Sequence, residues 1–268
     1  MRAESKTASV ILAAGRGSRM TGFTGNKTLL PLAPKDSPYS GHHPILLHIL
    51  RNLPKGPKAL VVNYRKQAVI AATRGLNLIY CEQPTLNGTG GGLLAAQPFL
   101  ETQNCDEVII TMGDVPFVKA TTYAALVNHL KENSLAVLGF RPKHKKQYGV
   151  LETRETKVSR IIEWKYWSEY PEKTRRNFKI CNAGIYAARR SELLHYLSVL
   201  ASRPHSVQKS IDGEEKKVAE YFITDLVEYM HQDDLPVGFI VSENEAEVMG
   251  IDDVSALQEA QRIFMRDG

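Results

Sequence analysis

The sequence predicts an α/β fold, in which helices cover both faces of a Rossmann-like, mixed, mainly parallel sheet and a small antiparallel subdomain follows. Two observations carry this prediction. Up to about residue 140, short continuous apolar runs alternate with segments of helical periodicity, the pattern of βαβ units around a buried parallel sheet. After that point, three strand-like runs follow one another around a polar segment, which favours antiparallel pairing.

In the first half, the apolar runs predict buried strands and the periodic segments predict the helices between them. The expected strands are Ser9–Ala14, Ala59–Asn63, Asn77–Cys81, Glu107–Met112 and Leu135–Phe140. The expected helices are Pro44–Leu53, Lys66–Arg74, Gly92–Ala96 and Thr121–Glu132. Proline in the first turn of the first helix, Gly75 after the second and a threonine N-cap on the fourth support these limits. The segment Pro34–His43 is expected to be an inserted loop.

In the second half, the expected antiparallel strands surround the polar segment Ser168–Lys179. The expected antiparallel strands are Gly149–Thr153, Val158–Trp164 and Ile180–Ala187, and Val237–Ser242 is a later strand. The expected helices are Ser191–Leu200, Tyr221–His231 and Asp253–Met265. The last helix is amphipathic, with Val254, Leu257 and Phe264 on one face. We therefore expect one domain over residues 1–268, with one half to about residue 140 and a second from about 141.

Composition excludes several classes of protein. The chain has 268 residues, 43% of them hydrophobic and 24% charged, the proportions of a globular protein rather than a disordered or collagen-like one. Its net charge of +5 suggests anionic partners. Cys81, Cys105 and Cys181 form no C-x-x-C pair, which argues against a disulfide framework or a cysteine zinc site and fits a reducing compartment.

Targeting signals are also weak. No apolar run approaches the ~18–20 residues that span a bilayer. A short apolar run follows Arg2 and Lys6, but no cleavage site follows it, and a buried strand explains it better. We expect a cytoplasmic protein without a membrane partner.

The strongest local signal is a glycine loop directly after the first expected strand. Gly15 and Gly17 allow the backbone to turn sharply and to bring N–H groups close to phosphate oxygens. Arg16, Arg19 and Lys27 add positive charge around the same loop. The pattern indicates a triphosphate as the partner.

The loop matches neither of the two common glycine loops. A Walker A loop needs lysine directly after its last glycine, whereas Asn26 separates Gly25 from Lys27. A dinucleotide fingerprint needs a third glycine where Met20 stands. A dinucleotide-dependent oxidoreductase is therefore disfavoured. Nucleic-acid binding is the weakest alternative, because the positive charge gathers in one loop without interleaved aromatic residues.

A series of short motifs, of which this loop is the first, extends in order along nearly the whole chain. They are Leu12–Met20 with Lys27–Leu32, Gln83-x4-Gly88-Thr89-Gly90, Gly113-Asp114-Val115-Pro116, Tyr148-Gly149, Ile162-Glu163, Asn182-Ala183-Gly184-Ile185, Glu220–Asp225 and Glu247–Asp252. In this order they resemble the sugar-1-phosphate nucleotidyltransferase family. Within it, the chain is most similar to the uridylyltransferase domains of bifunctional N-acetylglucosamine-1-phosphate uridylyltransferases. The resemblance implies a nucleotide-diphospho-sugar transferase fold of GT-A type.

The resemblance also implies roles for individual residues. The expected nucleotide-binding set is Leu12, Ala13, Ala14, Gly15, Gly17, Gln83, Gly88 and Thr89, with the Gln83 amide reading uracil. Arg19, Lys27 and Asp114 form the expected catalytic set, in which the two cations bind the triphosphate and stabilise the leaving pyrophosphate. The expected acceptor-binding set is Gly149, Glu163 and Asn182, and Thr89 also borders the sugar side.

Asp114 and Asp252 are the expected ligands of Mg²⁺. Asp114 falls at the carboxyl end of an expected strand, where open α/β sheets bind ligands. Mg²⁺ prefers one or two carboxylates together with phosphate oxygens and water. Where the family pattern has asparagine, this chain has Asp252, a second carboxylate that makes the site more negative and still suits Mg²⁺.

Other departures from the family pattern concern single positions and the end of the chain. Met112 replaces the usual tyrosine before Gly-Asp, and Asn26 replaces the proline before the active lysine. No hexapeptide repeats follow the last expected helix, so acetyl transfer is not expected of this chain. Trp164 and Trp167 are expected to pack in the core.

Together these observations predict a Mg²⁺-dependent nucleotidyltransferase that makes a nucleotide-sugar and pyrophosphate from UTP and a sugar 1-phosphate such as N-acetylglucosamine 1-phosphate. Its nucleotide-binding half would end near residue 140, and its acceptor-binding half and closing helix would follow. CTP with phosphocholine, or GTP with another acceptor, is the alternative within the same class. A non-catalytic nucleotide sensor on the same fold is the alternative from a different class. The oligomeric state, monomer or dimer, stays open.

Overall fold

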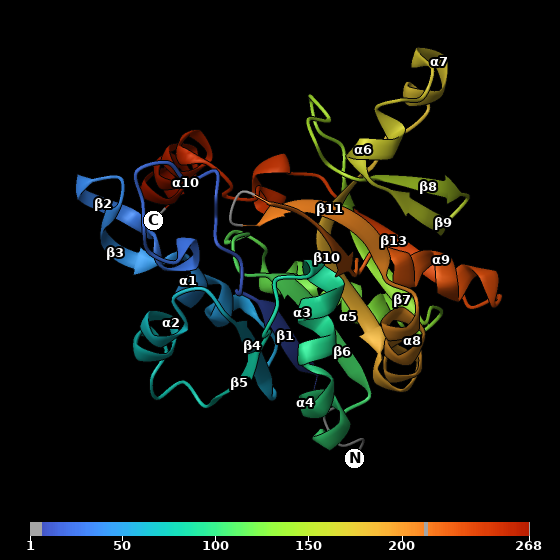
Figure 1. Cartoon of the computed structure of the whole chain (residues 1–268), viewed down its shortest axis with the longest axis horizontal. Helices are drawn as coiled ribbons and strands as arrows, with labels where there is room; N and C mark the ends of the chain where they lie inside the picture. Colours follow the sequence, from blue (N-terminus) through green and yellow to red (C-terminus); the bar gives the residue numbers. More distant parts are fainter. Residues whose placement is uncertain (1–6, 212–213, 268) are drawn as a thin grey trace.

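The computed structural model describes residues 7–211 and 214–267, and in these residues a nine-stranded sheet with the order β5-β4-β1-β6-β10-β7-β13-β9-β8 forms the centre (Figure 1). Its strands are β1 (Ala8–Leu12), β4 (Lys58–Val62), β5 (Leu78–Glu82), β6 (Glu107–Met112), β7 (Leu135–Phe140), β8 (Val150–Arg154), β9 (Lys157–Ile162), β10 (Cys181–Arg189) and β13 (Val237–Ser242). β9 and β10 are antiparallel to the other strands of the sheet. The predicted α/β class and mixed sheet are confirmed.

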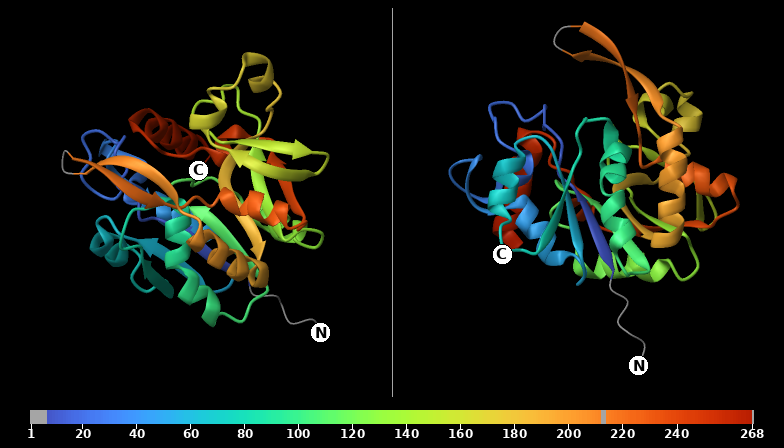
Figure 2. Two further views of the ribbon diagram at one scale, coloured as in Figure 1. Left: turned by 45° about the vertical axis from the view of Figure 1, so that its right-hand side comes forward. Right: turned by 60° about the horizontal axis from the view of Figure 1, so that its bottom comes forward.

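Helices cover both faces of this sheet, as predicted (Figure 2). One face packs against α1 (Ile45–Asn52), α2 (Lys66–Ala72) and α5 (Ala120–His129), and the other against α3 (Gly88–Ala95), α4 (Gln97–Thr102), α8 (Arg190–Ser202) and α9 (Asp225–Gln232). α10 (Val254–Asp267) joins the first of these cores and packs on the segment Pro31–Ser37. Successive strand residues point to opposite faces, so Val10 joins the core under α3 whereas Ile11 joins the core under α1. Because both faces are covered, β7 is continuously apolar, and so is β1 except for the buried Ser9.

The antiparallel strands were predicted correctly, but they do not form a separate subdomain. β8 and β9 pair with each other and also join the main sheet, through Val150 opposite Cys181 of β10 and Lys157 opposite Gly238 of β13. The strands β10, β7, β13, β9 and β8 thereby form a closed, barrel-like ring of pairings. The ring buries Val150, Leu151 and Val158, which a detached two-stranded ribbon would leave exposed.

Two hairpins were not predicted. Pro34–His43, expected to be a loop, belongs to the hairpin of β2 (Pro31–Ser37) and β3 (Ser40–Pro44). β11 (His205–Ile211) and β12 (Glu214–Glu220) form a second hairpin that extends away from the sheet (Figure 2, right). β2 and β3 contain prolines and are largely exposed, and the sequences of β11 and β12 are mostly polar or charged. Neither hairpin therefore shows the apolar alternation that marks a strand in a sequence.

The remaining elements are short. They are α6 (Trp164–Trp167), α7 (Glu172–Arg175) and the 3₁₀ turns η1 (Lys27–Leu29) and η2 (Glu245–Val248). The threonine N-cap expected for α5 is wrong: Lys119 occupies the cap position, and the hydroxyl of Thr122 donates to Glu247 instead. No helix within the described ranges has both the length and the apolarity needed to cross a membrane.

The order of the strands determines where a ligand can bind. From β1 the chain moves outward to β4 and β5, then returns to place β6 on the other side of β1. This reversal leaves a crevice at the carboxyl ends of β1 and β6, the position at which open α/β sheets bind their ligands.

Candidate active site

The loops that follow β1 and β6 meet in this crevice. The N–H of Gly113 donates to the carbonyl of Leu12 over 2.9 Å. A Cβ at position 113 would lie 2.9 Å from that same oxygen, so the approach requires glycine. The carbonyl of Asp114 in turn accepts from the N–H of Ile251 over 3.0 Å, which brings Asp252 beside Asp114. Residues far apart in the sequence thus gather at one point.

A cavity of about 310 Å³, here called the glycine-loop cavity, opens beside the end of β1. Its lining is Leu12, Ala13, Ala14, Gly15, Arg16, Lys27, Thr28, Gln83, Leu86, Gly88, Thr89, Gly92, Met112 and Asp114. It brings together every residue of the expected nucleotide-binding set except Gly17. Gly17 has a φ of +64°, and a Cβ there would lie 3.1 Å from Cδ of Lys27, so this glycine makes room for the lysine side chain.

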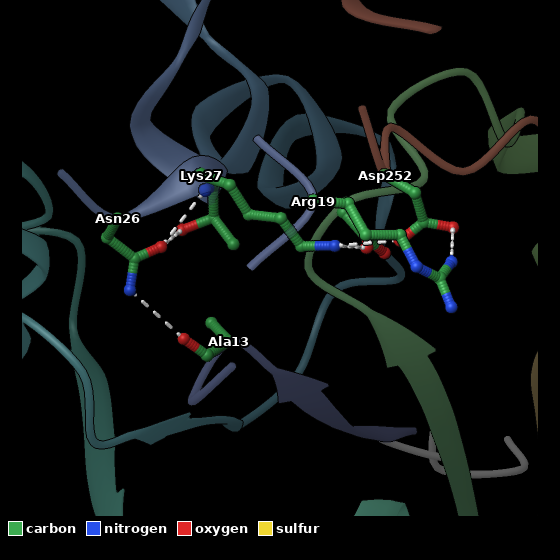
Figure 3. Close-up of polar contacts among 7 residues, drawn as sticks. Ala13, Arg19, Asn26, Lys27 and Asp252 are labelled. Carbon is green, nitrogen blue, oxygen red and sulfur yellow. Dashed lines mark hydrogen bonds and ion pairs between the residues drawn. The ribbon is translucent and has the colours of Figure 1, made fainter. Parts of the chain in front are cut away.

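Asn26 fixes the turn that carries Lys27 (Figure 3). Its side-chain oxygen accepts from the N–H of Thr28 at 3.0 Å and from the hydroxyl of Thr28 at 2.8 Å. Its amide nitrogen donates to the carbonyls of Tyr64 at 2.8 Å and Ala13 at 3.3 Å. The buried amide therefore ties the lysine turn to the glycine loop. The sequence signal was the departure from proline at this position, whose meaning the sequence did not reveal.

The ammonium of Lys27 lies between two carboxylates. Its Nζ donates to Oδ2 of Asp114 and, over 3.1 Å, to Oδ1 of Asp252. Burial lowers the pKa of Lys27, but attraction to the two carboxylates outweighs it, so the pKa lies above the ordinary lysine value. Arg19 lies farther out, 63% exposed, with Nη1 3.8 Å from Oδ2 of Asp252 and Nη2 3.4 Å from Oε1 of Gln147. The expected catalytic residues therefore converge, Lys27 most tightly.

The chemistry of Asp114 and Asp252 suits a divalent cation. Both carboxylates reach a single ammonium, so the space between them already holds positive charge. Mg²⁺ is held in many enzymes by one or two carboxylates, water and substrate phosphates. Within the described residues, no cluster of three or more His, Cys, Asp or Glu side chains is arranged to hold a metal. A Mg²⁺ ion here would take its other ligands from water and a phosphorylated substrate.

A second cavity of about 220 Å³, here called the β10 cavity, adjoins the first. Its lining is Thr89, Met112, Asp114, Val115, Tyr148, Glu163, Asn182, Ala183, Gly184, Tyr186, Ile223, Thr224, Val248, Gly250 and Asp252. Thr89, Met112 and Asp114 line both cavities. Two expected acceptor residues, Glu163 and Asn182, line the β10 cavity directly. Gly149 does not, but its carbonyl accepts from the N–H of Asn182 over 2.8 Å and so positions the wall.

Asn182 and Glu163 are both held by neighbouring groups. The amide of Asn182 donates to the hydroxyl of Tyr186 over 2.8 Å and accepts from the N–H of Gly184 over 3.0 Å, which shapes an irregularity in β10. Oε1 of Glu163 accepts from the hydroxyl of Thr224 over 2.9 Å. Burial raises the pKa of Glu163 above the usual glutamate range. Thr224 lies in an expected motif, but its contact with Glu163 was not foreseen.

The two tryptophans differ. Trp167 is buried and donates its indole N–H to the carbonyl of Tyr148 over 2.9 Å, as core packing predicts. Trp164 is 40% exposed, so the expectation of core packing is wrong for it. Trp164 is the first residue of the short α6 helix and lies outside the sheet. Together with Lys165 and Phe222 it lines a third cavity, here called the outer hollow.

Comparison with known proteins places this geometry in a family. The family model of MobA-like NTP transferase domains matches residues 9–206, which include the glycine loop, Asp114, Glu163 and Asn182. The chain belongs to this family. It is therefore a nucleotidyltransferase, as the motifs predicted.

Among curated relatives, the bifunctional protein GlmU of Novosphingobium aromaticivorans is 29% identical over 264 residues, covering 96% of this chain and 52% of that protein. The chain thus spans about half the length of the curated relatives it matches. The resemblance expected from the motifs is confirmed at this distance.

Two solved structures share the fold. One, described as a glucose-1-phosphate thymidylyltransferase from Bacillus anthracis, has a TM-score of 0.68 at 18% identity and covers 96% of this chain and 95% of its own. The other, described as a UDP-N-acetylglucosamine pyrophosphorylase from Entamoeba histolytica, has a TM-score of 0.71 at 14% identity and covers 96% of this chain and 80% of its own. The names of these structures differ in the nucleotide base, so the shared fold does not determine the base.

Proposed function

We propose that this nucleotidyltransferase joins UTP to a sugar 1-phosphate, such as N-acetylglucosamine 1-phosphate, and releases pyrophosphate with the help of Mg²⁺. The observation that carries the proposal is the pair of adjoining cavities that share Asp114, with Lys27 and Asp252 beside it. One cavity suits a nucleotide and the other a polar acceptor. Their common border is where the two substrates would react.

The reaction requires no covalent enzyme intermediate. An oxygen of the acceptor phosphate attacks the α-phosphorus of the nucleotide, a new P–O bond forms, and the bond to the bridging oxygen of pyrophosphate breaks. The acceptor phosphate is already ionised near neutral pH, so no dedicated base is needed. Catalysis then consists of positioning the substrates and neutralising charge.

Different residues bind the nucleotide, stabilise its negative charge and hold the metal ion. Backbone groups of Leu12–Gly15 and Gly88 bind the nucleotide, and Gln83 contacts the base. Lys27 and Arg19 stabilise negative charge on the triphosphate and on the departing pyrophosphate. Mg²⁺ would be held by Asp114 and Asp252, and when bound it supplies further charge neutralisation.

The β10 cavity would hold the sugar. Glu163 carries a carboxylate that accepts hydrogen bonds from hydroxyl groups, and Thr89 adds a hydroxyl at the border between the cavities. Gly149 and Asn182 shape the wall. We assign residues 1–268 to one catalytic domain, with its acceptor half from about residue 141, and we place the enzyme in the cytoplasm.

One observation favours the alternative acceptor, phosphocholine. The outer hollow continues from the β10 cavity past Glu163 and Asp252. There the ammonium of Lys165 lies 5.2 Å from the ring centroid of Phe222, so this aromatic face already accepts a cation. A quaternary ammonium group would suit the same environment.

A pyrophosphate-release screen tests these proposals. The full chain is assayed with UTP, CTP, GTP and ATP against a panel of sugar 1-phosphates and phosphocholine, with and without Mg²⁺. We expect Mg²⁺-dependent release with UTP and a hexosamine 1-phosphate. Activity confined to CTP and phosphocholine would overturn the uridylyl proposal. Nucleotide binding without turnover on any acceptor would favour a nucleotide sensor.

A further inference from the structure

The N-terminus of α3 carries an asparagine that does not cap its helix. Asn87 occupies the N-cap position, where an asparagine side chain ordinarily accepts from the helix N–H groups. Here it makes no such bond. Its Oδ1 accepts instead from Nε2 of Gln83 over 3.0 Å. The side chain of Asn87 therefore holds the amide of Gln83 instead of capping α3.

The orientation of the Gln83 amide follows from its neighbours. Nε2 also donates to the carbonyl of Gly88 over 3.0 Å, and a carbonyl can only accept, so the amide nitrogen must face that side. Asn87 and Gly88 together take both N–H groups of the amide. Among the described residues no donor reaches Oε1, which lies 3.3 Å from where a Cβ at Gly92 would be, at the wall of the glycine-loop cavity. The amide thus presents an acceptor to this cavity.

The glycine run in α3 makes this arrangement possible. A Cβ at Gly91 would lie 1.8 Å from Oδ1 of Asn87, so any larger residue would displace the asparagine side chain. Glycine inside a helix costs about 1 kcal/mol relative to alanine. The sequence therefore retains an unfavourable helix residue where the asparagine needs the space.

We propose that Asn87 is a positioning residue for base recognition: it holds Gln83 so that the carbonyl oxygen of the amide, and not its N–H groups, meets the base. This inference rests on the proposed function, in which Gln83 contacts the nucleotide. The polarity of the contact selects a base with a ring N–H, such as uracil, over cytosine.

The hydrogen-bonding edges of the two pyrimidines explain the selection. Uracil presents a ring N–H donor between two carbonyl acceptors, which complements Oε1 of Gln83. Cytosine presents a ring nitrogen that only accepts, so two acceptors would face each other without a proton. Without Asn87, the carbonyl of Gly88 is the one remaining acceptor that holds the amide nitrogen of Gln83. The amide can then rotate more readily and turn an N–H toward the cytosine ring nitrogen. An unpartnered group in a buried site is the usual source of strong discrimination.

The test compares UTP and CTP on the full chain and on single variants. We expect Asn87→Ala to lower the UTP-over-CTP ratio of kcat/KM about tenfold, through KM and with kcat nearly unchanged. Calorimetric binding of the two nucleotides should show the same change. Gly91→Ala should reproduce it by displacing Asn87. Asn87→Asp keeps an acceptor for Gln83, so it should weaken both nucleotides alike and preserve the ratio.

Asn133→Ala provides the matched control. Asn133 is likewise an asparagine whose amide bonds neighbouring residues, Lys157 and His129, but it is buried, whereas Asn87 is half-buried, and it precedes β7 at the opposite end of the sheet. It should lower thermal stability without changing the nucleotide ratio. An unchanged ratio in both Asn87→Ala and Gly91→Ala, in an enzyme that prefers UTP, would overturn the role of Asn87 alone. A wild-type enzyme that binds UTP and CTP equally, with no effect of Gln83→Ala, would overturn the base-contact part of the proposed function as well.

Discussion

The glycine-loop cavity and the β10 cavity adjoin at Asp114, yet they are constructed differently. The first is lined by the loop after β1 and by the start of α3, and backbone borders it at Gly15, Gly88 and Gly92. A Cβ at Gly88 would lie 2.3 Å from the carbonyl oxygen of Tyr221, and one at Gly92 would lie 3.2 Å from Cδ2 of Leu12. The second is lined by side chains from distant segments that bond one another, such as Glu163 with Thr224.

This difference has a consequence for function. A wall of backbone groups presents the same N–H donors whatever the neighbouring side chains, which suits the invariant phosphates of a nucleotide. A wall of side chains can change by substitution, which suits recognition of one acceptor among many. We therefore expect changes near the glycine loop to affect turnover in general, and changes around β10 to affect the choice and affinity of the acceptor.

The largest effect is expected at the border that both cavities share. Asp114→Asn keeps the size of the side chain but removes the charge, and transfer should fall about a thousandfold because the transition-state charge is no longer balanced. UTP affinity measured by calorimetry should change far less than turnover. Asp106→Asn is the matched control, since Asp106 precedes the same strand β6 at its opposite end and is exposed. A fully active Asp114→Asn enzyme would contradict the proposed mechanism.

Lys27 tests the nucleotide side of the comparison. Lys27→Met should lower transfer about a hundredfold, since one cation near the triphosphate is lost. The same change leaves Asp114 without a cation and Asp252 with only the exposed guanidinium of Arg19, 3.8 Å away, so Tm without metal should fall and added Mg²⁺ should raise it more than in wild type.

Two measurements decide this prediction: pyrophosphate release and thermal melting at low and high Mg²⁺. Lys66→Met serves as the control, because Lys66 pairs with Glu82 at the surface, away from both cavities. Equal Mg²⁺ responses in Lys27→Met and wild type would show that the lysine and the metal do not compete for these carboxylates.

The difference between local sequence signals and contacts between distant segments explains which features of the site could be predicted from the sequence. The loop after β1 and the position of Asp114 follow from local signals, namely a buried apolar run, glycines and a strand end. By comparison, Asn26 contacts Tyr64 and Glu163 contacts Thr224 across long stretches of sequence, and such contacts depend on the finished fold. The β11–β12 hairpin was missed because little apolar alternation marks it. Asp252 was found only through motif order, since nothing local distinguishes it from Asp253.

Asn26 tests whether the rigidity of the lysine turn matters. Asn26→Ala removes four hydrogen bonds from a buried position and should lower the free energy of unfolding by about 3 kcal/mol. Turnover should fall about tenfold, because Lys27 is less firmly placed. Urea denaturation and pyrophosphate release measure the two effects. Asn244→Ala is the matched control: Asn244 caps η2 in the same way but is exposed, so it should cost about 1 kcal/mol and leave turnover intact.

The smallest effect is expected on the acceptor side, at Glu163. Glu163→Gln should raise the KM for the acceptor about tenfold, because a hydroxyl bonds a carboxylate more strongly than an amide, and should leave the KM for UTP unchanged. An equal rise in both KM values would contradict the assignment of the acceptor to the β10 cavity and of the nucleotide to the glycine-loop cavity.

The same variant carries a pH prediction. Burial raises the pKa of Glu163, so the folded protein keeps a proton that the unfolded chain, with a pKa near 4.5, has lost. Between these two pKa values the folded state binds more protons, and wild-type stability therefore falls as pH rises. The amide that replaces the carboxyl group does not titrate, so the Tm of Glu163→Gln minus that of wild type should increase with pH from about 4.5 and level off above the raised pKa. A Tm difference that shrinks over this range would mean that the carboxylate is stabilised by its surroundings, and that the β10 cavity is more polar than its buried lining indicates.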